Sequence, residues 1–232
     1  MPKPAPRRPL ADIHAVHDQV YAAIRDALLT GRIPPGRGVS LRSLAAELGV
    51  SPMPVRDAVR RLVAEHALVI NQANKRLSAP SLTAERLEQL AVARAWIEPE
   101  LAARAAPCAD AAFIGRLRQA DEALNAAIVH GDVNAYMAAN HAFHFGVYQA
   151  AGAEVLLAMA GGLWLQVGPF MRVVFDRLGT VNLTRDHHVD VMDALAAHDA
   201  QAAHAAMAAD IAVGMNAMRA AVEEEGRASG VA

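Results

Sequence analysis

Cysteine, aromatic residues and long uninterrupted apolar runs are all scarce in this chain of 232 residues. The single cysteine, Cys108, excludes an internal disulfide framework and is typical of a reducing compartment. Aromatic residues make up only 4% of the chain although hydrophobic residues make up 54%. Alanine, the best helix former, supplies much of the apolar content. The composition therefore predicts packed helices rather than a sheet.

The apolar runs of the sequence also predict no targeting segment and no membrane span. The N-terminal sequence MPKPAPRRPLADIH contains no apolar run of signal-peptide length. The longest apolar stretch, VLLAMAGGLWLQVGPF, is shorter than a membrane span and is interrupted by Gly and Gln. We expect a cytoplasmic protein with no membrane partner.

Charge is distributed unevenly along the chain, although the net charge is only −2. Residues 1–80 contain 12 Lys and Arg against 6 Asp and Glu, whereas the remaining residues contain 10 against 18. A basic unit followed by an acidic one indicates two domains with different partners, the basic one being the candidate for a polyanion. The predicted organisation is a disordered arm (1–9), a DNA-binding domain (10–80), a helical effector-binding domain (81–226) and a disordered tail (227–232).

The basic unit contains the layout of a helix-turn-helix in LRSLAAELGVSPMPVRDAVRRL, residues 41–62. Gly49 ends the first helix, Ser51 is placed to cap the second, and Pro52 occupies its first position, where no N–H is needed. The following ALVINQANKRLSAP alternates apolar and polar residues around a basic tip, which predicts a two-stranded hairpin. A solvated helix pair is the alternative, but the hairpin and the basic charge favour a double-stranded DNA partner.

The second helix of such a motif enters the major groove with its N-terminal end, and the first helix crosses the phosphate backbone. Arginine is suited to bidentate contact with guanine, and basic residues on the first helix and at the hairpin tip are suited to phosphates. The predicted DNA contacts are Arg42, Ser51, Met53, Arg56, Arg60, Asn74, Lys75 and Arg76.

Residues 12–79 resemble the winged-helix domain of GntR-type bacterial transcription regulators, through DALLTGRIPPGRGVSLRSLAAELGVSPMPVRDAVRRLVAEHALV. The resemblance implies that Arg42 and Arg56 contact operator DNA and that residues 74–76 form the wing. Two positions depart from the family pattern. Pro52 stands where the family usually has Arg, and the wing run NKRLSA has no glycine.

From Ser81 onward the apolar spacing is helical throughout, with breaks at Pro107, Gly131, Gly152 and Gly179. This half is expected to be an all-α antiparallel bundle of six helices. The expected helices lie near 83–106, 110–130, 133–151, 154–177, 182–198 and 199–225.

Four groups with N and O donors can converge within this bundle. Asn140 and His144 are four residues apart and share one helix face. His188 and Asp210 lie at similar distances on either side of the break near residues 198–199, so they can face each other across a helical hairpin. Two imidazoles plus oxygens suit Zn²⁺, Ni²⁺ or Mn²⁺. The alternative is chance spacing among ten histidines that are merely solvated or satisfied in the core.

The acidic half resembles the FCD effector domain of the FadR-like branch of the same family. ARAWIEPELAARAA matches its first helix at Arg94 and Glu98, NHAFH matches with Asn140 in place of Asp, and Asp210 replaces the final His. The resemblance implies a divalent metal site and a small carboxylate effector. An arginine fork binds a carboxylate bidentately, so Arg94 and Arg172 are the predicted effector contacts, with a salt bridge to Glu98 as the alternative for Arg94.

Together these observations predict a ligand-responsive transcription regulator, a repressor rather than an enzyme. We expect a homodimer, because helix-turn-helix proteins commonly read two half-sites. Two alternatives stay open. One is a metal-dependent helical enzyme with an attached DNA-binding domain, although no HExxH or Glu-x-x-His motif is present. The other is a regulator that senses an apolar ligand without metal.

Overall fold

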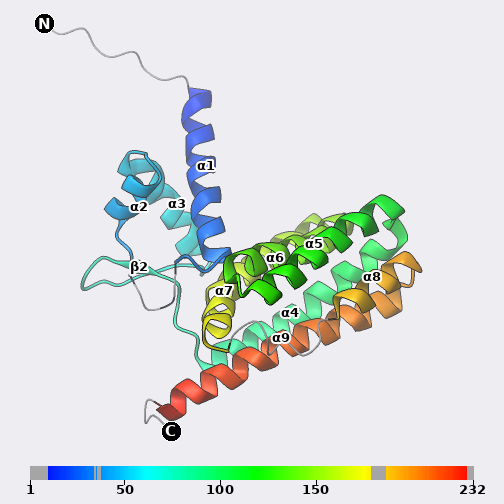
Figure 1. Ribbon diagram of the computed structural model, residues 1–232. Coiled ribbons are helices and arrows are strands. Elements are labelled where there is room, and N and C mark those ends of the chain that lie inside the picture. The colour runs from blue at the N-terminus through cyan, green and yellow to red at the C-terminus, as the bar shows by residue number, and fades with distance from the viewer. Residues whose placement is uncertain (1–9, 34, 36–37, 179–186, 229–232) are drawn as a thin grey trace, which may run out of the picture.

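Helices form most of the residues that the computed structural model describes, which are 10–33, 35, 38–178 and 187–228. The predicted arm (1–9), the last four residues of the predicted tail and the start of the predicted helix 182–198 lie outside the described residues. Two units are visible, a small N-terminal one and a larger bundle, and α1 rises from the bundle beside α7 (Figure 1).

The N-terminal unit packs three helices against a short hairpin. Ser40 caps α2 in a reciprocal capping box with Ser43, which satisfies the free N–H groups at the helix start. Gly49 has a φ of +65°, a conformation that glycine adopts without strain, and it makes the turn into α3. The buried apolar residues of the three helices form one core. Its elements are α1 (Leu10–Leu29), α2 (Leu41–Glu47), α3 (Pro52–Ala64), β1 (Val69–Ile70) and β2 (Leu77–Ser78).

The wing is shorter than the alternation suggested, because only two residues on each side pair as antiparallel strands. The Asn71 side chain accepts hydrogen bonds from the backbone N–H groups of Ala73 and Asn74, which holds the tip in a turn. Lys75, in the wing tip, has a φ of +57°, in the left-handed region. These side-chain bonds replace ladder bonds, so the tip is a loop rather than strand.

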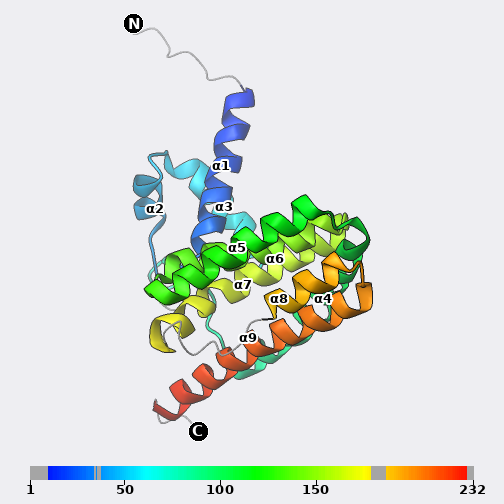
Figure 2. The same ribbon diagram turned by 45° about the vertical axis from the view of Figure 1, so that its right-hand side comes forward.

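The second unit is an antiparallel bundle in which α4 packs along α9, α5 along α6, and α8 along α9 (Figure 2). Four helix starts are capped by side chains, those of Thr83, Asp110, Asp132 and Asp199, each accepting from the backbone N–H three residues on. The helices are α4 (Ala84–Ala105), η1 (Ala106–Cys108), α5 (Ala111–His130), α6 (Val133–Ala150), α7 (Glu154–Leu178), α8 (His188–Ala196) and α9 (Ala200–Ala228). The winged helix-turn-helix and the six-helix bundle confirm the predicted fold class.

Helix α7 joins the two units. Leu165 is buried in the core of the N-terminal unit, although it belongs to the bundle. A Cβ at Gly168 would lie 2.9 Å from the carbonyl oxygen of Leu29, so α1 and α7 approach more closely than any larger residue would allow. Arg86, at the start of α4, donates to the backbone oxygen of His66 and to the side chain of Gln166.

The apolar stretch of α7 is longer than the sequence pattern indicated. By length and composition alone, Glu154–Val174 could cross a membrane, with a mean hydropathy of 1.3. Half of that window is buried inside the fold, as it is in the core helix of a bundle. Its apolar character is explained by the two cores that it serves.

Candidate functional sites

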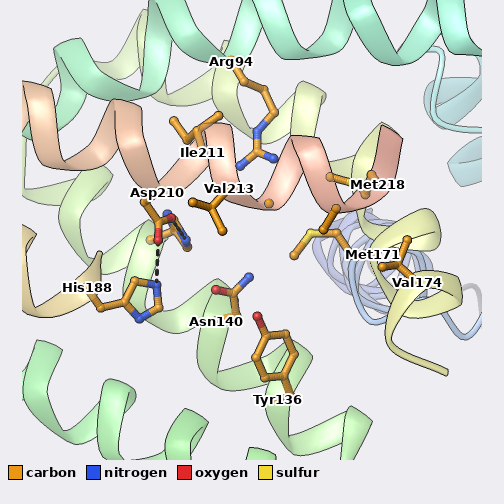
Figure 3. Close-up of a pocket in the computed structure, with 13 residues that line it drawn as sticks. Arg94, Tyr136, Asn140, Met171, Val174, His188, Asp210, Ile211, Val213 and Met218 are labelled. Carbon is orange, nitrogen blue, oxygen red and sulfur yellow. Dashed lines mark ion pairs between the residues drawn. The ribbon is translucent and has the colours of Figure 1, made fainter. Parts of the chain in front are cut away.

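A pocket in the bundle opens between α4, α6, α7, α8 and α9, and its polar side chains converge at one end (Figure 3). Met171, Val174 and Met218 lie toward the other end, whereas Ile211 and Val213 lie beside Asp210. The lining residues of the described chain are Arg94, Tyr136, Asn140, His144, Met171, Val174, His188, Asp210, Ile211, Val213, Gly214, Ala217 and Met218.

Two histidines and an aspartate meet at the polar end. His144, His188 and Asp210 each offer a ligand atom, and these three atoms lie within 4.8 Å of one another. Nε2 of His144 lies 3.3 Å from Oδ2 of Asp210, and Nε2 of His188 lies 3.9 Å from Oδ1. Asn140 lines the same pocket. The fold therefore brings together all four residues singled out as metal ligands from the sequence.

The other ring nitrogen of each histidine is held by a residue behind the site. Nδ1 of His188 lies 3.0 Å from Oδ1 of Asp121, and Nδ1 of His144 lies 3.0 Å from the hydroxyl of Tyr148. Because Tyr148 donates its own proton to Glu98 at 2.5 Å, its oxygen accepts from His144. Both imidazoles then carry their hydrogen on Nδ1 and direct an Nε2 lone pair at Asp210, which is the arrangement of metal-binding histidines.

Burial keeps His144 and Tyr148 in their neutral forms. Desolvation, reinforced by the nearby His188 and Arg94, lowers the pKa of His144 well below its usual value. Desolvation and the Glu98 carboxylate raise the pKa of Tyr148 well above its usual value. At neutral pH the site therefore presents an uncharged imidazole, the form that binds a metal.

Arg94 is committed to an ion pair along one edge of its guanidinium. Its Nε and Nη2 lie 2.6 and 2.9 Å from the two carboxylate oxygens of Glu98, and both residues are buried. Burial alone would lower the pKa of Arg94, but the Glu98 charge outweighs it and raises the pKa. Arg94 lines the pocket, yet the bidentate edge expected to hold an effector carboxylate already holds Glu98, the alternative partner considered from the sequence.

Arg172, the second predicted effector contact, points elsewhere. Its Nη1 donates to the backbone oxygen of Thr30 at 3.3 Å and to the side chain of Asn134. It is not among the described residues that line the pocket. The helix turn carries it to the face of α7 that contacts the N-terminal unit, whereas Met171 faces the pocket.

Sequence reasoning missed the residues that orient the histidines. Tyr148 lies four residues after His144 on α6, so helical spacing could have identified it. Asp121 lies on α5, and nothing in its local sequence indicates that its helix packs against α8. Both are buried polar side chains whose hydrogen bonds end at the candidate metal ligands.

The helix-turn-helix presents its predicted DNA contacts to solvent. Arg42, Met53, Arg56 and Arg60 are exposed, and Met53 is 58% exposed although it is apolar. Arg60 lies 3.8 Å from Asp57 on the same helix. Packing within the chain does not explain why Met53 is exposed among arginines. Its exposure is consistent with a surface that contacts another molecule.

Ser51 occupies the N-cap position of α3, but its side chain makes no capping hydrogen bond, contrary to the sequence prediction. The usual partners are the N–H groups of the second and third helical residues. Pro54 is the third residue and has no N–H, so only Met53 could donate. The exposed Ser51 hydroxyl is therefore not used in the cap.

The wing residues Asn74, Lys75 and Arg76 are exposed at the hairpin tip. Arg76 donates through Nε to the backbone oxygen of Gly38 at 2.6 Å, which fastens the wing to the segment before α2. Lys75 donates to the side chain of Gln72 at 3.0 Å. The wing thus lies beside the helix-turn-helix and extends its basic surface.

Comparison with known proteins identifies both units. Residues 16–74 match the bacterial regulatory proteins of the gntR family, and residues 89–213 match the FCD domain. The chain is 27% identical to the HTH-type transcriptional regulator McbR of Escherichia coli (strain K12) over 169 residues, covering 73% of this chain and 76% of that protein. It is 28% identical over 184 residues to a protein of Paenarthrobacter nicotinovorans named "Probable D-xylose utilization operon transcriptional repressor", covering 79% and 80%.

The architecture is likewise similar to that of a solved regulator. The structure of E. coli McbR/YncC superposes with a TM-score of 0.80 at 24% identity, covering 88% of this chain and 96% of that one. At this identity the likeness establishes the fold. The FCD match, which spans more than half of the chain, and the gntR match before it agree with the observed arrangement. The chain belongs to the GntR family of bacterial transcriptional regulators, in the FadR-like branch that carries an FCD domain.

Proposed function

We propose that this regulator is a cytoplasmic, homodimeric repressor whose winged helices bind operator DNA and whose bundle binds a small carboxylate effector through a divalent metal. In this proposal residues 10–80 are the DNA-binding domain and residues 81–226 the effector domain. The observation that carries it is the convergence of two imidazole nitrogens and a carboxylate in a pocket. Repression is supported by the name of the relative from P. nicotinovorans.

Operator binding is assigned to the exposed face of the helix-turn-helix and the wing. The N-terminal end of α3, with Met53 and Arg56, is the part that enters a major groove in this motif. Arg42 and the wing residues would contact phosphates, with Ser51 and Arg60 at the edges of the same face. Two such faces in a homodimer match two half-sites.

The metal would be held by His144, His188 and Asp210, with Asn140 as a fourth ligand. Three acceptors face one another within 4.8 Å, and the buried histidines have their Nδ1 atoms occupied, so a cation is the complementary group at this point. Two nitrogens and carboxylate or amide oxygens suit Zn²⁺, Ni²⁺ or Mn²⁺. When bound, the ion would supply a positive charge for the effector's carboxylate.

The effector signal would pass through α7. Met171 and Val174 line the pocket, whereas Leu165 and Gly168 on another face of the same helix contact the N-terminal unit. An effector that packs against Met171 would displace α7 and with it α1. Because α1 belongs to the core of the winged helix, this would change the separation of the two DNA-reading faces in the dimer.

The metal and effector roles can be tested in untagged protein by measuring bound metal, acid binding and operator release. His144→Ala and His188→Ala should lose the metal and the response to acid while keeping DNA binding. His204→Ala is the matched control, because His204 is exposed on α9 and does not line the pocket. Unchanged metal content and acid affinity in the pocket variants would refute the proposed site, and turnover of the acid would favour an enzyme instead.

Operator binding can be tested on the DNA upstream of the protein's own coding sequence. We expect salt-sensitive binding, since each phosphate contact releases counterions. Lys75→Ala should reduce the slope of log affinity against log salt by about one, if its ammonium contacts a phosphate. A salt-independent affinity, or the same slope in this variant and the wild type, would contradict the assignment of the wing.

A further inference from the structure

The pocket has two ends of different chemistry, and this difference restricts the effector. One end holds the histidines, Asp210 and Asn140, and the other is formed by apolar side chains of α7 and α9 (Figure 3). Met171, Val174 and Met218 lie together at the apolar end, away from the candidate metal ligands. A molecule that fills the pocket therefore meets polar groups with one part and hydrocarbon with the rest.

The positive charge at the polar end can balance only one carboxylate of an effector. A divalent ion there is partly neutralised by Asp210, which leaves one surplus positive charge among the ligands. Arg94 contributes no further surplus, because Glu98 neutralises it through two hydrogen bonds of 2.6 and 2.9 Å. Asp121 adds a negative charge behind His188, outside the ligand set, so the surplus is at most one positive charge. Two or three carboxylates would therefore exceed the charge that the site can balance.

At the apolar end, the described residues offer no cation for a second anion. Arg94 is the single Lys or Arg among the described residues that line the pocket. A carboxylate placed beside Met171 and Val174 would lose its hydration without gaining a cation or a donor, which is strongly unfavourable. A hydrocarbon chain in the same place gains free energy from burial.

Small residues on α9 leave room for such a chain. Gly214 and Ala217 both line the pocket, one turn apart between Ile211 and Met218. A Cβ built on Gly214 meets nothing within 4 Å, so the space beside it is open rather than filled by neighbouring side chains. This open strip runs along α9 from Asp210 toward the apolar end.

We propose that the effector is a monocarboxylic acid with an unbranched apolar tail, its carboxylate at the metal end and its tail along Gly214 between Met171 and Met218. This assignment rests on the proposed function of the pocket and narrows it. It excludes citrate-like tricarboxylates, dicarboxylates and sugar acids as the preferred ligands. The selectivity comes from at most one surplus positive charge at the metal end and from the lack of a cation among the described residues at the apolar end.

The test measures acid binding to the full-length, metal-loaded protein by calorimetry, with operator release measured in parallel. The probes are straight-chain acids from acetate to decanoate, the dicarboxylates of matching length, citrate and gluconate. Each methylene that enters the apolar end of the pocket should tighten binding about fourfold until that end is full. Dicarboxylates should bind more weakly than the monocarboxylates of the same length.

A variant at the apolar end of the pocket identifies where the tail of the acid lies. Gly214→Val fills the open space and should shift the preferred acid to a shorter chain, because it weakens the binding of long-chain acids more than that of acetate. Gly115→Val on α5 is the control, since a Cβ there also meets nothing within 4 Å and the residue does not line the pocket. An unchanged chain-length preference in Gly214→Val would overturn the placement of the tail.

The outcomes separate this inference from the proposed function. Tight binding of citrate or gluconate with operator release would overturn the apolar tail and leave the acid-responsive regulator intact. Chain-length-dependent binding without any effect on DNA would support the tail and refute the regulatory response. Absence of binding by every acid would overturn both.

Discussion

The close contact between α1 and α7 makes Gly168→Ala a specific probe of how the two units are joined. A methyl group at this position would lie 2.9 Å from the backbone oxygen of Leu29 and 3.1 Å from its Cα. Backbone atoms cannot rotate away as a side chain can, so the helices must separate. Forcing one extra carbon into a packed interface typically costs about 1–3 kcal/mol.

Helix propensity opposes this loss, because alanine is favoured over glycine by about 1 kcal/mol in a helix interior. Gly162→Ala corrects for that gain, since Gly162 lies in the same helix and a Cβ there meets nothing within 4 Å. The difference between the two variants therefore isolates the contact with α1. We expect Gly168→Ala to be less stable than Gly162→Ala by about 1–3 kcal/mol, the cost of the added carbon.

Urea unfolding of both variants at one protein concentration measures this difference, and a fixed concentration is needed because a dimer's stability depends on it. Operator affinity should fall more in Gly168→Ala, because α1 forms part of the winged-helix core. Equal stability of the two variants would refute the tight contact. Equal stability together with a normal effector response would also refute transmission through α7.

Three further substitutions test the buried ion pair, the support of the metal ligands and the DNA-reading face. Glu98→Gln should destabilise the fold by about 3–5 kcal/mol, because it leaves Arg94 charged and unpaired in the core. Glu100→Gln removes an exposed ion pair and should cost at most about 1 kcal/mol in the same unfolding assay. Asp121→Asn should lower zinc affinity about 10–100-fold in a competition titration, and an unchanged affinity would show that the carboxylate behind the second histidine does not support binding. Arg56→Ala should weaken operator binding by about 1–3 kcal/mol and relax sequence preference at one position; equal losses on all sequences would assign it to a phosphate instead.

Most elements of the fold could be predicted from local signals, because several helix ends are marked in the sequence. Gly49, Gly131 and Gly152 have positive φ at the ends of α2, α5 and α6, where breaks were predicted. The capping of α3 could not be predicted from residue type alone. There the N-cap serine precedes a helix whose third residue is proline, so one of the two usual donors is absent and the side chain makes no cap hydrogen bond.

The candidate metal ligands were accessible to sequence reasoning for a different reason. Asn140 and His144 are related by helical spacing, and His188 and Asp210 by the near-equal lengths of chain on either side of a turn. The residues behind them depend on which helices are neighbours, which local patterns do not encode. Asp121 reaches His188 only because α5 packs against α8.

The ion pair of Arg94 decides how the charge of the pocket is divided. The sequence predicted that Arg94, an arginine on an apolar helix face, would bind the carboxylate of a ligand directly. In the fold its Nε and Nη2 bind Glu98, and Glu98 also accepts from Tyr148, which in turn accepts from His144. Arg94 therefore orients the histidine through a chain of hydrogen bonds and has its charge neutralised in doing so. Arg94 is the single Lys or Arg among the described residues that line the pocket, so in the proposed function the positive charge for an acidic effector would come from an ion held by the histidines.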